Sequence, residues 1–491
     1  LALNKELIDV KEQMDINEYW YYNEKNQIRM SIHKYKYWLQ QNNFFKFYPE
    51  DKDGFTFVQI NQNTIEEVDR DKIKDFVLKD IEKRPDVGLQ PYEVMAGNLG
   101  CFKNDFLSFL DPVRIEFLQD KKDESFVYYN NKVLKVTSLS VEEIDYLDLS
   151  GSIWNEQIIN RDFKYTDFSQ SEYRKFIWLV SGQDESKFNS FRSAIGFLLH
   201  LYKTSATNKA IILNDEKISD KPNGGSGKGI FWKALQEIRK VHYLSGKDYN
   251  EKDKFKFQTA KKDTQVYVFD DVKKNFDFEN LFNLITEGIT LEYKGAGAIN
   301  VPIEKSPKIL ITTNYTIAGA SGSFERRIFE LEFSNHFSAG YTPADMFGHE
   351  LFKDWSTSEW NRFDSFMIDC LQYYLGNGLV KQQHENLQTR KFIKSTCFEF
   401  YEWLNGDNGI IELGKEIPKG DAYNEFIGEY DNLKFKVTHR QFIKWIDIYA
   451  EFNDLKVTPG RNHLYRWFRL DKKTIDITPQ KEEDKQIDIP F

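Results

Sequence analysis

A glycine-rich loop constrains this chain more than any other feature of its sequence. Residues 222–229, with the sequence PNGGSGKG, lie between a predicted strand and a predicted helix. Small residues in such a loop let backbone N–H groups surround a phosphate, while the lysine reaches its outer oxygens. The N-terminus of the following helix adds the positive end of its dipole. The loop therefore predicts a phosphate site formed by Asn223, Gly224, Gly225, Ser226, Gly227, Lys228 and Gly229.

Three short apolar runs predict buried strands of a parallel α/β sheet. They are residues 210–213, 266–269 and 309–313. Asp270 and Asp271 follow the second run, and Asn314 follows the third. Because the carboxyl ends of parallel strands meet at one edge, we expect these side chains near the loop. Asp270 would then hold Mg²⁺, Asp271 would orient or deprotonate an attacking water, and Asn314 would contact that water or the γ-phosphate.

The loop departs at two positions from the phosphate-loop pattern G-x-x-x-x-G-K-[ST]. Pro222 replaces the first glycine, and Gly229 replaces the serine or threonine whose hydroxyl binds Mg²⁺. The second departure matters more, because glycine offers no side-chain oxygen. We therefore expect phosphates, water and Asp270 to hold the metal. A flexible glycine turn without a ligand is the alternative interpretation.

Composition excludes several classes of protein. A length of 491 residues suggests about three domains, and 41 Phe with 26 Tyr exclude a disordered chain. The best apolar run, residues 194–199, is too short to cross a membrane. Cys101, Cys370 and Cys397 form no C-x-x-C pair, so a disulfide scaffold or zinc ribbon is not expected, and a reducing, cytoplasmic setting is. The sequence does not begin with Met, and we expect a further domain upstream.

The two ends of the chain carry weaker signals. Residues 33–48 interleave Lys with aromatic residues, which predicts either a surface that stacks on single-stranded nucleic acid or an ordinary core segment. Helical spacing predicts an amphipathic helix over 65–82 and helices within 171–203.

The C-terminal region is basic. The net charge is +6 over residues 434–473, in a chain of net charge −10. We predict a helix from Thr438 to Phe452, a turn at 458–460, a second helix over 461–470 and a strand at 474–478. That arrangement resembles a winged helix.

Together these landmarks resemble a superfamily 3 helicase of the AAA+ class, in particular the helicase part of poxvirus-type and phage primase-helicases. The resemblance covers residues 186–337 and rests on IGFLLH at 195–200, the loop, FDD at 269–271, TTN at 312–314 and FERRI at 324–328. It implies an α/β fold: an AAA+ P-loop parallel-sheet core with an N-terminal α+β region, a helical collar and a C-terminal winged-helix-like domain. The implied segments are 1–165 for the α+β region, 166–205 for the collar, 206–337 for the ATPase core, 338–395 for a helical segment and 396–491 for the basic domain.

The resemblance also implies an activity. It is that of an ATP-dependent replicative DNA helicase of a phage or mobile element, located in the host cytoplasm and without a membrane. The cofactors would be ATP and Mg²⁺, and the partners would be single-stranded or forked DNA and an upstream primase-type domain. A homo-hexameric ring would move along one strand and hydrolyse ATP at its subunit interfaces.

Further residues receive roles from the same resemblance. A hairpin over 289–303 would place Lys294 at its tip in a central channel, with Lys305 as a second candidate; an exposed hairpin with a solvated lysine is the alternative. Arg326 or Arg327 would be an arginine finger. We favour Arg326 and expect Arg327 to pair with an acidic neighbour. The C-terminal domain, through Arg461 and Arg466, would contact DNA or a replication partner, or would merely pack.

Two rival functions remain. One is an AAA+ remodelling or switch ATPase that acts on protein. The other is a DNA-loading scaffold in which Gly229 has abolished turnover.

Overall fold

The computed structural model describes residues 19–472 with internal gaps. The gaps are residues 50–53, 85–88, 217–224, 251–252, 254–255, 258, 260, 262, 274–275, 277, 293–297, 316–325, 382–388, 390–391, 394 and 406–410. The chain divides into two compact units, of which the second holds residues 383–491 and two short segments, 216–223 and 314–316. Among the described residues, no helix has the length and apolar composition that a membrane crossing needs.

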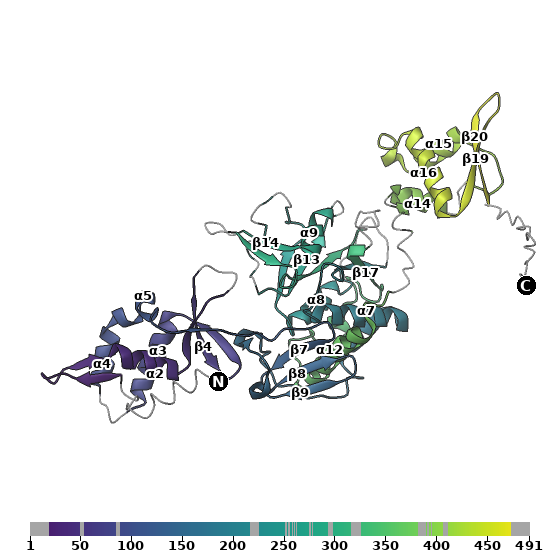
Figure 1. Cartoon of the computed structure of the whole chain (residues 1–491). Coiled ribbons are helices and arrows are strands. Elements are labelled where there is room, and N and C mark those ends of the chain that lie inside the picture. The colour runs from purple at the N-terminus through teal and green to yellow at the C-terminus, as the bar shows by residue number, and fades with distance from the viewer. Residues whose placement is uncertain are drawn as a thin grey trace, which may run out of the picture. The chain divides into compact units, whose positions relative to one another are not determined.

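Five parallel strands form the central sheet of the first unit, in the order β12-β13-β16-β11-β17. Figure 1 labels two of them, β13 and β17. Their bounds are β11 (Ala210–Asp215), β12 (Val241–Ser245), β13 (Val266–Val272), β16 (Lys308–Thr313) and β17 (Ile328–Phe333). The predicted strands β11, β13 and β16 are confirmed. The prediction lacked β12, at one edge of the sheet, and β17, at the other.

The sheet lies between two apolar layers, because successive side chains of a strand point to opposite faces. On β11, Ile211 and Leu213 join one core, whereas Ala210 and Ile212 join the other. The first layer contains α6 (Glu172–Val180), α7 (Glu185–Leu199), α8 (Lys228–Gln236) and α12 (Thr357–Asn377). The second contains η4 (Phe278–Leu281), α9 (Phe282–Thr286) and the antiparallel hairpin of β14 (Gly288–Leu291) and β15 (Ile299–Pro302). Helices α6, α7 and α8 and the hairpin confirm the prediction, and α12 falls within the predicted helical segment 338–395. The prediction lacked η4 and α9.

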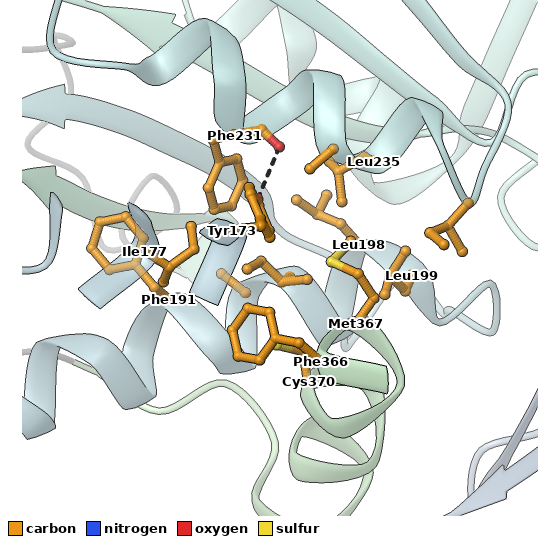
Figure 2. Packing of buried hydrophobic residues seen from close by; sticks show 14 of the residues in the cluster. Tyr173, Ile177, Phe191, Leu198, Leu199, Phe231, Leu235, Phe366, Met367 and Cys370 are labelled. Carbon is orange, nitrogen blue, oxygen red and sulfur yellow. Dashed lines mark hydrogen bonds between the residues drawn. The ribbon is translucent and has the colours of Figure 1, made fainter. Parts of the chain in front are cut away.

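Close packing joins the helices of the first layer. Figure 2 shows Tyr173 of α6 donating a hydrogen bond to the backbone oxygen of Phe231 on α8, at 3.4 Å. Helices α7 and α12 approach each other at Gly196, where a Cβ atom would lie 2.1 Å from the backbone oxygen of Cys370. Only glycine therefore fits at this crossing.

The N-terminal region is an α+β arrangement around a mixed sheet of order β10-β5-β4-β3-β6. Its elements are β1 (Trp20–Tyr22), β2 (Ile28–Met30), α2 (Ile32–Gln41), β3 (Phe44–Phe47), β4 (Thr56–Asn61), β5 (Thr64–Val68), α3 (Arg70–Glu82), α4 (Gln90–Gly97), η1 (Leu99–Phe102), α5 (Asn104–Leu107) and β6 (Pro112–Val113). Tyr35, Trp38 and Phe44 are buried in its core, which supports the core interpretation of residues 33–48 over the stacking surface. The helix predicted over 65–82 is wrong at its start, because residues 64–68 pair with β4 as a strand.

Shorter elements connect these parts. A three-stranded meander consists of β7 (Glu124–Tyr129), β8 (Lys132–Thr137) and β9 (Val141–Ile144), and the remaining elements are η2 (Tyr146–Asp148), β10 (Ile153–Trp154), η3 (Asn155–Gln157) and α11 (Pro343–Phe347).

The second unit has its own apolar core. Its elements are α14 (Phe398–Asn405), β18 (Ile417–Pro418), α15 (Lys419–Glu429), η5 (Asp431–Leu433), α16 (His439–Phe452), β19 (Leu455–Arg461) and β20 (Arg466–Lys472). Helix α16 and its Thr438 cap confirm the prediction. The helix predicted over 461–470 is wrong: β19 and β20 form an antiparallel hairpin there, with Phe468 and Leu470 buried at alternate positions. The strand predicted at 474–478 lies outside the described residues.

The α7–α12 crossing gives a stability prediction. Gly196→Ala should lower the free energy of unfolding by about 2 kcal/mol, because the added methyl group forces two packed backbones apart. Thermal and urea unfolding would measure the change. Gly376→Ala, on α12 itself, is the matched control: its Cβ would meet only Ser138, at 3.6 Å, so stability should hold or rise slightly. Equal losses in both variants would contradict this account of the crossing.

Candidate functional site

Thr312 links the two acidic residues at the end of β13 to the neighbouring strand β16. Its hydroxyl donates a hydrogen bond to Oδ1 of Asp270 at 2.6 Å and accepts one from the backbone N–H of Asp271 at 2.7 Å. Thr312 is buried, so water does not compete for these bonds. The pairing of Phe269 with Ile311 explains the contact, since it brings Asp270 level with Thr312. Sequence reasoning missed this role of Thr312.

A bulge at the end of β13 sets the conformation of Asp271. The register between β13 and β16 shifts between Phe269 and Val272, and Asp271 has a φ of +56°. A non-glycine residue in this region is uncommon and is often found at functional sites. The bulge turns the Asp271 carboxylate toward Lys247, whose Nζ lies 2.5 Å from Oδ2. Lys247 follows β12, so three strands meet around this carboxylate.

The part of the glycine-rich loop that the structure describes is packed against two neighbouring segments. Gly225 and Gly227 have φ values of +109° and +94°, which favour glycine. A Cβ on Gly227 would lie 2.7 Å from the ring of Phe176 on α6, whereas a Cβ on Gly229 would meet nothing within 4 Å. Conformation and close packing therefore explain the glycine at both positions, 225 and 227. Asn223 and Gly224 lie outside the described residues.

Lys228, the first residue of α8, pairs with a carboxylate that the sequence analysis did not single out. Its Nζ lies 2.6 Å from Oδ2 of Asp215, the last residue of β11, and 3.3 Å from Oγ of Ser226. Both charged side chains are at most 15% exposed. Asp215 lies at the carboxyl end of a predicted parallel strand, as Asp270 does. The argument that identified Asp270 could therefore have identified Asp215 as well.

The carboxyl ends of adjacent parallel strands bring this set together. Leu213 of β11 is level with Thr312 of β16, which is level with Asp270 of β13. Neighbouring strands are about 4.8 Å apart, so β11 and β13 lie about 10 Å apart. Lys228 of the glycine-rich loop and the acidic residues thus share the carboxyl ends of the strands, where a parallel α/β sheet binds its ligands. Asn314 is the residue that follows β16 at this end.

Arg326 and Arg327 lie at the amino ends of the strands, opposite the carboxyl ends that carry the candidate site. They precede β17, whose first residue, Ile328, is level with Ala210 at the start of β11. A six-residue strand spans about 20 Å, so the amino ends of the strands are far from the glycine-rich loop. The Arg327 guanidinium lies over the ring of Phe282, 4.7 Å from its centroid, whereas Arg326 is exposed. The expected acidic partner of Arg327 stays a prediction.

The predicted DNA-binding residues belong to three different segments of the chain. Lys294 falls outside the described residues, in the segment that joins β14 and β15. Lys305 is exposed in the turn after β15, at the base of the hairpin and not at its tip. Arg461, the last residue of β19, is paired with Arg466, the first residue of β20, and both are exposed. Lys305 precedes β16 and therefore lies at the amino ends of the strands, away from the strand-edge site.

No cluster of three or more His, Cys, Asp or Glu side chains suited to a metal occurs among the described residues. A metal at the strand edge would therefore need oxygens beyond those of the protein, such as those of a bound phosphate. The carboxylate of Asp270 is the side chain placed to hold it, with Thr312 fixing its orientation.

Comparison with known proteins gives limited matches. A family model described as "Family of unknown function (DUF5906)" matches residues 221–327, from the glycine-rich loop to Arg327. No curated protein matches. Two solved structures of the NrS-1 C-terminal region, both described as A form apo structures, are similar to this chain. The first has 12% identity and a TM-score of 0.39, and the similarity covers 89% of this chain and 98% of that one. The second, of residues 305–718, has 14% identity and a TM-score of 0.37, with 88% and 97% covered. TM-scores below 0.5 do not establish a common fold, so the functional case rests on the site residues.

The Thr312 contacts give a prediction for binding. Thr312→Val removes a hydrogen bond to a charged group and leaves the Asp271 N–H without its acceptor, so affinity for Mg²⁺ with inorganic tripolyphosphate should fall roughly tenfold. Calorimetric titration would measure it, and Thr312→Ser should restore binding.

The neighbouring residue supplies the control. Thr313 is equally buried, but its hydroxyl donates to the backbone oxygen of Val272 at 3.3 Å. Thr313→Val should therefore leave metal-dependent binding unchanged. Equal affinities in the two valine variants would show that the Thr312 hydroxyl does not position the carboxylates.

Proposed function

We propose that this chain is an ATP-dependent DNA helicase of the superfamily 3 type. One observation carries the proposal: the lysine of a glycine-rich loop and a pair of acidic residues meet at the same edge of a parallel sheet. Phosphate-transferring ATPases need such a pairing, because the lysine binds the β- and γ-phosphates and a carboxylate binds the metal.

The loop residues fit a nucleotide. Gly225 and Gly227 have backbone conformations that favour glycine, and α8 begins directly after Gly227. Backbone N–H groups of this segment would bind phosphate oxygens, and Lys228 would exchange the Asp215 carboxylate for a phosphate. The bound nucleotide would supply the phosphoanhydride bond that is hydrolysed.

The acidic residues divide the remaining chemistry. Asp270, held by Thr312, would bind Mg²⁺. Asp271, turned by the bulge, would accept a proton from the attacking water or orient it, and Asn314 would contact the same water. The space beside Gly229 is open, and phosphate oxygens or water would fill the metal position that a Ser or Thr hydroxyl usually takes.

The arginine pair supports an oligomer. Arg326 lies about 20 Å from the loop of its own subunit. It would therefore act as a finger only on the γ-phosphate bound by a neighbour, which requires a ring. We propose a homo-hexamer with a site at each interface.

Two parts of the chain would bind DNA. The β14–β15 hairpin would carry Lys294 into the central channel, and single-stranded or forked DNA would pass there. In the second unit, the order α14-β18-α15-α16-β19-β20 supports a winged helix, with Arg461 and Arg466 at the end of its wing.

Hydrolysis of ATP with and without single-stranded DNA tests the function. The wild type should hydrolyse ATP faster with DNA, and Lys228→Ala should reduce turnover at least a hundredfold, because it removes the charge that binds the phosphates. Lys233→Ala, an exposed lysine on the same helix, should behave as wild type.

Other results would favour the rival functions. If DNA does not stimulate ATP hydrolysis, and the Lys294→Ala variant hydrolyses ATP as fast as the wild type, a remodelling ATPase acting on protein would be favoured. Nucleotide binding without any turnover would favour a DNA-loading scaffold.

Mixing two inactive variants tests the ring. In a mixed ring, a Lys228→Ala subunit still offers Arg326, and an Arg326→Ala subunit still offers its loop. Random mixing of equal amounts should therefore restore about a quarter of the interfaces, and ATP turnover should recover accordingly. No recovery, with mixed rings verified by mass spectrometry, would contradict an arginine acting across the interface.

A further inference from the structure

A short turn after β17 carries three aromatic rings. Residues 336–341 form this turn, which we call the aromatic turn, and its rings are those of His336, Phe337 and Tyr341. The backbone N–H of Ser338 donates to the oxygen of Tyr341 at 2.9 Å, and that of Tyr341 donates to the oxygen of Ser338 at 3.2 Å. The two bonds hold the turn closed, so its rings have a fixed arrangement.

The rings of the aromatic turn continue into the core. Phe337 is buried and stacks on Phe176 of α6, with centroids 5.9 Å apart and planes 18° apart. Tyr341 stacks on Phe337 at 6.1 Å and 28°, and it is 44% exposed. The stack therefore begins at a buried helix and ends in a tyrosine ring open to solvent.

This stack lies against the phosphate-binding loop at two points. A Cβ on Gly225 would lie 2.9 Å from the backbone carbon of Ser338, and a Cβ on Gly227 would lie 2.7 Å from the Phe176 ring. The aromatic turn thus contacts the loop at Gly225, and Phe176, on which Phe337 stacks, contacts it at Gly227.

Hydrogen bonds hold the segment after β17 in that position. Ser334 donates its backbone N–H to the oxygen of Val180 and its hydroxyl to the oxygen of Leu179, both at 2.7 Å. The end of α6 and the start of the aromatic turn are therefore joined before any ligand binds, which lowers the ordering cost of binding.

We propose that the aromatic turn binds the base of the nucleotide whose phosphates the loop takes, and that a purine ring stacks on Tyr341. The inference rests on the proposed function, because it presumes a nucleoside triphosphate at the loop. A ring with an open face, fixed beside a phosphate cradle, is a stacking platform for a base.

Stacking reads the face of a base and not its edge. We therefore expect ATP and GTP to bind within a few-fold of each other, and both more tightly than CTP or UTP.

Binding of ATP and of inorganic tripolyphosphate, which has no base, separates the two subsites. Tyr341→Ala should weaken ATP binding roughly five- to hundredfold and leave tripolyphosphate binding unchanged, because only the stacking face is lost. Tyr341→Phe should bind ATP as wild type does. Tyr165→Ala, which removes another exposed tyrosine, should change neither ligand. Calorimetry on the full chain with Mg²⁺ gives all these affinities.

The remaining outcomes would each overturn a different claim. If wild type binds tripolyphosphate as tightly as ATP, the base contributes nothing and the aromatic turn is not its site, although the phosphate site stands. If Tyr341→Ala weakens both ligands equally, the turn only supports the loop through Gly225. If wild type binds neither ligand, the proposed function falls, and the base site falls with it.

Discussion

Three adjacent parallel strands, β13, β16 and β11, end at the same edge of the sheet, and the groups of the candidate site are attached to those ends. Parallel pairing allows no other outcome, because every strand then has its carboxyl end on one side. The register of these strands brings Asp270 level with Thr312, and Thr312 level with the end of β11. The loop after β11 leads directly into α8. Lys228, the first residue of α8, therefore lies at the same carboxyl ends of the strands. Phosphate-binding and acidic groups meet there for this topological reason.

Under the proposed function, the same topology leaves the site incomplete within one subunit. Strand β17 is parallel to β11. The residues before it, Arg326 and Arg327, therefore lie at the amino ends of the strands, away from the candidate site. No rotation of a side chain spans about 20 Å. If hydrolysis uses an arginine at the γ-phosphate, that arginine must come from a second copy of the chain. Hydrolysis would then require assembly of the subunits. In the first layer, Gly196 and Gly227 let helices and loop approach closely enough to hold this edge rigid.

The sequence was sufficient for elements whose pattern is local and strong. The continuous apolar runs predicted β11, β13 and β16, glycine chemistry predicted the loop, and the family resemblance implied the hairpin. Strand β12 was missed because an edge strand is only half buried, and β17 because Glu330 and Glu332 interrupt its apolar residues. Residues 461–470 were assigned to a helix because a short hairpin and a helix can share the same apolar spacing. The contacts of Thr312 and Asp215 depend on register between strands far apart in sequence, which local patterns do not encode.

The most direct test of the central claim is a crystal structure of the full chain with Mg²⁺ and a non-hydrolysable ATP analogue. The account predicts phosphate oxygens on the backbone of Ser226–Gly229, with Lys228 released from Asp215 and bound to them. It predicts the metal beside Asp270, whose bond to Thr312 stays intact. A nucleotide bound elsewhere, or one bound at this edge with Lys228 still paired to Asp215 and no metal near Asp270, would contradict the account.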